Sequence, residues 1–431
     1  MSQKLTVIAL ATTMTLSAAA QAEEIDKPMF SFGGFGTVGI VHSSEKNADF
    51  QNSVFQPNGV GRTYNWDMNI DSKLAVQMTA NFTPQLSAVV QVISEQRYDN
   101  SYIPMVEWAN LKYAFTPDFN VRVGRTVLPA YLLSDSRKVG YATPWVRPPV
   151  SLYSLVPITN SDGIDASYRF RAGPVTNTVQ ASFGRNEILV AQGENGQARR
   201  VWGVYDTLEY GAATFHVAYQ RLNLTLPQLN ALFDNYRMFG PVGSAIADKY
   251  NSDHKQVTFV GAGVSYDPGD WFLMAEAGRQ TADSFIGDQT AWYVSGGYRF
   301  GSFTPYATYS HLKTTSNTSD PGIDPVAAAA AAVAALPPGT PGPVIAQVAG
   351  GVAGAAVGLS GLLNSLLMAT DEHTVSLGVR WDFAKNADLK VQFDRMYLGN
   401  NAMGTLRNLD PVNFRPGGNV NLFSVAVDFV F

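Results

Sequence analysis

The chain has 431 residues, 30 basic and 35 acidic side chains, a formal net charge of −5 and no cysteine. This mildly acidic balance excludes the electrostatic attraction that nucleic-acid-binding proteins need, so nucleic acid is not an expected partner. Apolar runs of about eighteen residues are absent between the N-terminal segment and residue 326, which excludes a bundle of membrane-spanning helices; the 38 glycines and 24 phenylalanines suit twisted strands instead.

Residues 1–22 have the pattern of a secretory signal peptide. Lys4 supplies the basic start, residues 5–20 are apolar or small, and Ala-Gln-Ala ends at Ala22. An N-terminal membrane anchor is the alternative, but the apolar run is short for a spanning helix and acidic residues follow it. We predict cleavage near Ala22 and a mature chain of residues 23–431.

The mature chain alternates apolar and polar residues with the period of a β-strand. Residues 73–82 place Leu74, Val76 and Met78 on one face, and Lys73 with other polar residues on the opposite face. A soluble sandwich alternates too, but here the apolar faces end in aromatic residues while the polar faces carry charges. The segment 255–267 can be read in either phase. In chain order, sixteen segments are predicted as strands: 30–41, 71–82, 86–98, 107–116, 119–125, 162–171, 174–185, 201–210, 213–222, 255–267, 270–281, 290–300, 302–313, 372–384, 387–397 and 420–431.

The connections between these strands alternate in length. Turn residues form seven short connections, for example Ala172-Gly173 and Gly211-Ala212, whereas the connections between them are mostly long. Short turns on one rim and long loops on the other are typical of outer-membrane barrels, in which the short turns face the periplasm. The sequence therefore predicts an all-β, antiparallel, up-and-down transmembrane β-barrel of about 16 strands.

On these features the chain resembles the trimeric sixteen-stranded porins of Gram-negative outer membranes. The matching features are the signal peptide, Gly34-Phe35-Gly36 in the first strand, a long third loop and the C-terminal Phe431. The resemblance implies a homotrimer in contact with outer-membrane lipid and lipopolysaccharide. The second loop, 99–106, is shorter than is usual in that family. The glycines of the first strand are therefore expected to support close packing between barrels.

The resemblance also implies that the third loop, residues 126–161, folds into the barrel and narrows the pore. Basic side chains outnumber acidic ones inside the loop, which predicts a positive constriction that favours anions. The alternative is that the arginines pair with nearby acids and only hold the loop. The predicted constriction residues are Arg122, Arg125, Asp135, Arg137, Lys138, Arg147, Asp162 and Asp165. The predicted pore-wall residues are Lys73, Lys112, Arg169, Arg299, Arg380, Asp382 and Lys390.

Two long connections contain helical patterns. Residues 314–371 form an Ala/Gly/Pro-rich segment whose last part mimics a transmembrane helix. Between two barrel strands it is predicted to be an extracellular loop, interpreted as an αα-hairpin interrupted at its prolines. Residues 223–254 predict a short packed surface helix.

The chain lacks the motifs of an enzyme. The five histidines are scattered, and Gly358-Leu359-Ser360-Gly361 does not match a nucleophile elbow. Asp320 and Asp324 are interpreted as a solvated turn rather than a calcium site. We therefore predict no catalytic residue, cofactor or metal. The predicted function is passive diffusion of small hydrophilic solutes and ions, favouring anions. The alternatives are a channel selective for small organic or inorganic anions and a structural or adhesive surface barrel.

Overall fold

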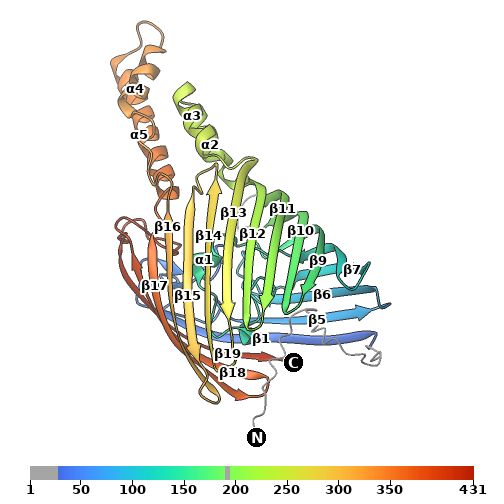
Figure 1. The fold of residues 1–431 in the computed structure, drawn as a ribbon. Helices are drawn as coiled ribbons and strands as arrows, with labels where there is room; N and C mark the ends of the chain where they lie inside the picture. Colours follow the sequence, from blue (N-terminus) through green and yellow to red (C-terminus); the bar gives the residue numbers. More distant parts are fainter. Residues whose placement is uncertain (1–27, 190–194) are drawn as a thin grey trace.

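The computed structural model describes residues 28–189 and 195–431. The predicted signal peptide lies outside the described residues. The described chain forms one antiparallel sheet that closes on itself as a barrel (Figure 1). This sheet has seventeen strands, of which the two-residue β4 (Trp66–Asp67) is a short addition beside β1, so sixteen strands make the wall.

The strands lie where the alternation predicted them, and most ends differ by only a few residues. Their bounds are β1 (Phe30–Ser43), β5 (Lys73–Asn81), β6 (Leu86–Glu95), β7 (Met105–Ala114), β8 (Phe119–Val127), β9 (Asn160–Ala172), β10 (Val175–Ile188), β11 (Gly196–Tyr210), β12 (Ala213–Thr225), β13 (Lys255–Tyr266), β14 (Trp271–Ala282), β15 (Gln289–Tyr298), β16 (Phe303–Thr314), β17 (Glu372–Ala384), β18 (Ala387–Leu398) and β19 (Gly418–Val430). Two further short strands, β2 (Asp49–Phe50) and β3 (Val60–Gly61), pair within the first long connection.

The barrel is closed by pairing between its first and last strands. Gly36 of β1 lies opposite Phe429 of β19, and the Gly34 amide donates a hydrogen bond to the Phe431 carbonyl. A Cβ atom at Gly36 would lie 2.4 Å from the Phe429 ring, and one at Gly34 would lie 2.3 Å from the Phe431 ring. These two glycines therefore make room for the C-terminal aromatic rings of the same chain, which is a different role from the expected packing between barrels.

The two faces of the wall differ in chemistry. Outward residues such as Val38, Leu74 and Phe393 are exposed, whereas the polar residues that alternate with them are covered inside the barrel. Aromatic pairs lie toward both ends of the strands, for example Phe303–Trp381 near the short turns and Trp292–Tyr309 toward the other rim. An apolar band between two aromatic girdles is the surface that a barrel presents to a bilayer.

The short and long connections lie at opposite rims. Gly173 and Gly211 occupy short turns with φ of +59° and +58°, a conformation that glycine adopts without the strain of a Cβ atom. The long connections carry the helices, which project beyond the rim opposite to the C-terminus (Figure 1). They are η2 (Pro227–Leu229), α2 (Asn230–Arg237), α3 (Gly240–Tyr250), α4 (Pro325–Ala334) and α5 (Gly342–Leu366), while η1 (Gly140–Ala142) and α1 (Val150–Tyr153) lie in the third connection. The predicted helical segments at 223–254 and 314–371 are thus each a pair of helices.

Candidate functional site

The connection between β8 and β9, residues 128–159, lies inside the barrel. At its base the Leu128 amide donates to the Thr159 carbonyl over 3.0 Å, so the segment leaves and re-enters the wall at one place. Between these points its helices contact strands on the other side of the barrel: α1 contacts β14, β15 and β16, and η1 contacts β1 and β19. We call residues 128–159 the internal segment.

One anchor of the internal segment is Trp145, which is 1% exposed. Its indole Nε1 donates hydrogen bonds to Ser295 Oγ of β15 and Thr308 Oγ1 of β16, over 2.9 and 3.0 Å. Tryptophan combines a large apolar ring with one donor, so it is stable when buried only if that donor finds a partner. Small inward hydroxyl residues on two neighbouring strands supply that partner here.

A second anchor is the carboxylate of Glu276 on the inner face of β14. It accepts hydrogen bonds from Tyr153 Oη over 2.8 Å, from Tyr293 Oη over 2.7 Å and from the Leu132 amide over 2.8 Å. The Tyr153 ring stacks on Tyr131 with 4.4 Å between ring centroids. Three donors satisfy a buried carboxylate that would otherwise be destabilised by loss of water.

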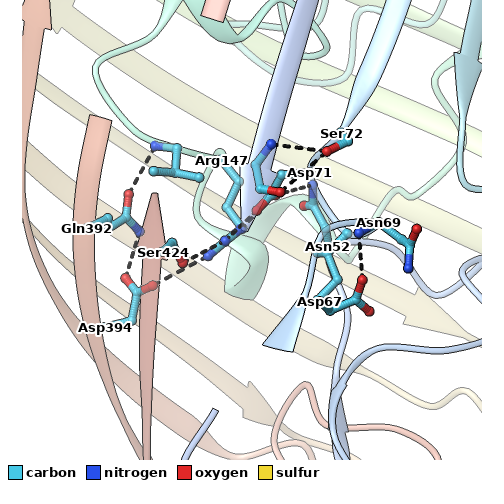
Figure 2. A network of polar contacts seen from close by, with 12 residues as sticks. Asn52, Asp67, Asn69, Asp71, Ser72, Arg147, Gln392, Asp394 and Ser424 are labelled. Atoms are coloured by element: carbon cyan, nitrogen blue, oxygen red, sulfur yellow. Dashed lines mark hydrogen bonds and ion pairs between the residues drawn. The ribbon is translucent and has the colours of Figure 1, made fainter. Parts of the chain in front are cut away.

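Arg147 forms the most buried ionic contact of the internal segment (Figure 2). Its guanidinium pairs with Asp71, which precedes β5, through bonds of 2.6 and 2.9 Å. It also donates to Ser424 Oγ of β19 over 2.8 Å and lies 3.5 Å from Asp394 of β18. The network joins both sides of the barrel seam to the internal segment.

Arg137 and Lys138 are adjacent but have different partners. Arg137 donates to the backbone carbonyls of Tyr153 and Val156 over 2.8 and 2.9 Å, and it forms no ion pair with a described carboxylate. Lys138 lies 2.6 Å from Glu95 and 3.0 Å from Glu107. Burial by itself would lower the pKa of Lys138, but these two carboxylates raise it, so Lys138 is a permanent cation at neutral pH.

The remaining predicted constriction residues lie on the flanking strands or on the surface of the segment. Arg122 Nε lies 2.9 Å from Asp165, and Arg125 forms a fork with Asp162 of 2.7 and 2.8 Å. Both pairs join β8 to its neighbour β9. Asp135 is exposed and has no ion pair among the residues with described positions.

The predicted wall residues divide into two groups. Arg380 pairs with Asp382 over 2.7 Å, and Lys390 lies 2.8 Å from Asp428 while donating to the Gly140 carbonyl. Lys73 faces Glu95 in the β5–β6 register and lies, like Arg380 and Lys390, beside the internal segment. Lys112 faces Arg122 in the β7–β8 register. The second group lies at the short-turn rim, away from that segment: Arg299, which pairs with the turn residue Asp267, and Arg169, whose amide donates to Asp118.

The sequence reasoning missed several acidic residues of the candidate site. Asp71, Glu95, Glu107 and Glu276 all contact the internal segment, yet none was assigned to the site. The available signal was an acidic residue on the polar face of a predicted strand or next to one. That signal shows that the side chain faces the lumen but not which loop residue it meets.

Beside the internal segment is a polar cavity of about 470 Å³. Residues of the connections 52–72 and 96–104 line it, together with the internal segment and the adjoining ends of β5 to β10. We call it the polar cavity. Five basic side chains line it, Lys73, Arg97, Arg125, Arg137 and Lys138, against four acidic ones, Asp71, Glu95, Glu107 and Glu187.

Comparison with known proteins agrees with this architecture. The family model described as Gram-negative porin matches residues 5–401. Among solved structures, Salmonella typhi OmpF in complex with daunomycin has a TM-score of 0.52 at 12% identity, covering 93% of this chain and 97% of that one. The loop L8 deletion mutant of Vibrio cholerae OmpT has a TM-score of 0.51 at 12% identity, covering 94% and 100%. No curated protein matches the sequence. The chain belongs to the Gram-negative porin family of outer-membrane channel proteins, and it is not an enzyme.

Proposed function

We propose that this porin forms a water-filled channel for passive diffusion of small hydrophilic solutes, with the internal segment as its constriction. The observation that carries the proposal is that residues 128–159 cross the barrel interior yet leave a polar, charge-lined cavity beside them. Fixed charges in a narrow aqueous passage with low-dielectric walls act on each ion that passes. No energy coupling is needed for such a path.

We further propose a weak preference for anions. Each buried base of the internal segment except Arg137 is paired with an acid, so most of the local charge is neutralised. One excess positive charge is left among the ionisable groups that line the polar cavity. Ion pairs that leave only one excess positive charge support a weak preference for anions, and they do not support strict exclusion of cations.

The test is the reversal potential of the purified protein in a planar bilayer under a KCl gradient. We expect a chloride-to-potassium permeability ratio slightly above one. A ratio below one contradicts the anion preference. Saturation of the current by one anion at millimolar concentration would favour the selective channel over general diffusion.

We also propose that the protein is a homotrimer with its short turns facing the periplasm. Membership of the porin family supports the trimer, and the outward apolar band suits contact with lipid. Mass measurement of the detergent-solubilised, unheated protein tests the oligomer. A monomeric mass under conditions in which the barrel stays folded would contradict this assembly.

The helical hairpin of α4 and α5 favours a second candidate function, adhesion at the cell surface. No charged residue lies between Asp324 and Asp371, and α5 has the length and composition of a membrane-crossing helix. Only 11% of the apolar 18-residue stretch in this helix is buried inside the structure. Exposed apolar surface of this extent marks an interaction site. Deleting residues 326–369 tests this function: loss of cell-surface binding with unchanged conductance would support it, and unchanged binding would refute it.

A further inference from the structure

A second cavity of about 460 Å³ lies at the long-loop end of the lumen, and its lining is mainly apolar. Leu222 and Leu224 of β12 and Val257 of β13 line it, and Phe285, Ile286 and Leu367 contribute from the loops. We call it the apolar cavity. Its volume lies within the ~300–1,000 Å³ of typical small-molecule sites, which combine apolar walls with a few polar groups.

The position of these leucines inside the barrel is unusual for a channel wall. The inner face of β12 is polar at His216 and Gln220 but changes to Leu222 and Leu224 near the long loops. The lumen of a water-filled barrel is ordinarily polar, because apolar side chains facing water lose the benefit of burial. Both leucines pack in one apolar cluster with Leu155 of the internal segment, and together they form an apolar wall against which the apolar part of a solute can pack.

Arg407 is the one ionisable side chain in the lining of the apolar cavity, as far as the described residues show. Its backbone is held by two hydrogen bonds with Asp49, each 2.8 Å long. Its guanidinium donates from Nη1 to the Leu406 carbonyl over 2.8 Å and forms no ion pair with a carboxylate of the described residues. The neighbouring acid Glu372 instead accepts hydrogen bonds from Ser151 and Thr405. The other N–H groups of the Arg407 guanidinium can therefore bind an anion, and arginine binds carboxylates with a matching fork.

The apolar cavity adjoins the polar cavity. Both cavities are lined by Phe55, Pro157, Ile158 and Ile188, so a solute that leaves the apolar cavity enters the polar cavity over an apolar border. The polar cavity contains Arg125, Arg137 and Lys138. An anion that begins at Arg407 therefore meets further basic residues along the passage.

We propose that the apolar cavity binds monocarboxylates with an apolar body and passes them to the polar cavity. The carboxylate binds Arg407, and the aliphatic or aromatic body packs against Leu222, Leu224 and Phe285. This inference rests on the proposed channel function and names its solute class. A single cation in an otherwise uncharged, apolar lining fits a monoanion of this kind better than a sugar or a polyanion.

The test uses octanoate as the probe and single-channel recording in planar bilayers. For the wild-type protein we expect a saturable decrease in current as octanoate is added. Octan-1-ol lacks the charge and acetate lacks the body, so neither should reproduce the effect. We expect Arg407→Gln to raise the half-blocking octanoate concentration at least tenfold, Arg407→Lys to raise it less, and Phe285→Ser to raise it severalfold.

Arg415→Gln is the matched control, because Arg415 is an exposed arginine on the same connection and does not line the cavity. It should leave octanoate block unchanged. Open-channel conductance without octanoate shows whether each variant is folded, and Arg407→Lys replaces Arg407→Gln if the latter does not conduct. A wild-type protein that conducts but is not blocked by octanoate overturns this inference alone, as does equal block of wild type and Arg407→Gln. A wild-type protein that does not conduct overturns the proposed function.

Discussion

At the scale of single residues, sequence separation decides which contacts could be foreseen. Arg122–Asp165 and Arg125–Asp162 join the two strands that flank the internal segment, and the antiparallel pairing of those strands brings them together. Arg147–Asp71 is a contact across 76 positions in the chain. This contact exists because the internal segment crosses the lumen. The alternation of apolar and polar residues along a strand does not predict where that segment crosses. The prediction of a mainly positive loop was therefore based on the basic residues of the loop and did not include the acidic residues of the wall that pair with them.

Replacing Arg147 with methionine should destabilise the barrel. The change leaves the buried carboxylate of Asp71 without its cation, which typically costs about 3–5 kcal/mol. The temperature at which the protein loses its compact mobility on gels should fall. The double variant Arg147→Met, Asp71→Asn should recover part of that loss, because it removes both charges. Arg415→Met is the exposed control and should change little. Equal unfolding temperatures for Arg147→Met and wild type would contradict the buried network.

Lys138→Met should shift ion selectivity toward cations. It leaves Glu95 and Glu107 without their common partner, so the lining of the polar cavity loses its one excess positive charge. The measurement is the reversal potential in a KCl gradient. Lys46→Met is a suitable control, because Lys46 is exposed and does not line either cavity. A reversal potential identical to wild type would show that Lys138 does not act on permeating ions.

At the scale of elements, the two longest connections between strands lie in opposite places, one inside the barrel and one outside it. The internal segment turns inward because Trp145, Tyr153 and Arg147 find partners on the far wall. The α4–α5 hairpin has no charged side chain that could pair with the wall, and it projects from the rim (Figure 1). Its helices were foreseeable from alanine and glycine content and from the interrupting prolines. The course of the internal segment was foreseeable only through resemblance to a family.

Shortening the internal segment should increase conductance. We expect replacement of residues 134–150 by a short Gly-Ser linker to raise single-channel conductance severalfold, because the part that fills the lumen is removed while the strands remain. Wall groups that lose a partner, such as Asp71, then contact water and are not left buried and unpaired. Replacing residues 328–360 of the hairpin in the same way is the control. If the first replacement leaves conductance unchanged, or the second raises it equally, the internal segment is not the constriction.

At the scale of the whole molecule, closure of the barrel depends on the fit between β1 and β19. The rings of Phe429 and Phe431 cover the outward face of Gly36 and Gly34. On the inner side of the seam, Asp428 of β19 accepts a hydrogen bond from Thr37 of β1 and pairs with Lys390 of β18. Lys390 also donates to the Gly140 carbonyl of the internal segment. The seam and the internal segment therefore meet in one small region of the wall.

Gly36→Leu should reduce the yield of folded barrel. A Cβ at this position already meets the Phe429 ring at 2.4 Å, so a leucine must displace that ring or the strand. Heat-modifiable mobility on gels after refolding measures the folded fraction. Val38→Leu is the control, because Val38 lies two residues on and is 53% exposed on the same outward face. Equal yields for the two variants would show that the glycine is not needed for closure.

The sequence alone determined the class, the strand count and the strand positions of this protein. Those features follow from local physics, since a strand facing lipid and water must alternate and a tight turn needs particular residues. The phase of 255–267 was open, and only packing resolved it by placing Phe259 inward against Tyr131. The tertiary structure likewise decided which acids neutralise Lys138 and Arg147, and that Leu222 and Leu224 face a cavity beside Arg407. These contacts join residues that are distant in the sequence. The residues become neighbours only because the barrel closes and the internal segment crosses its interior.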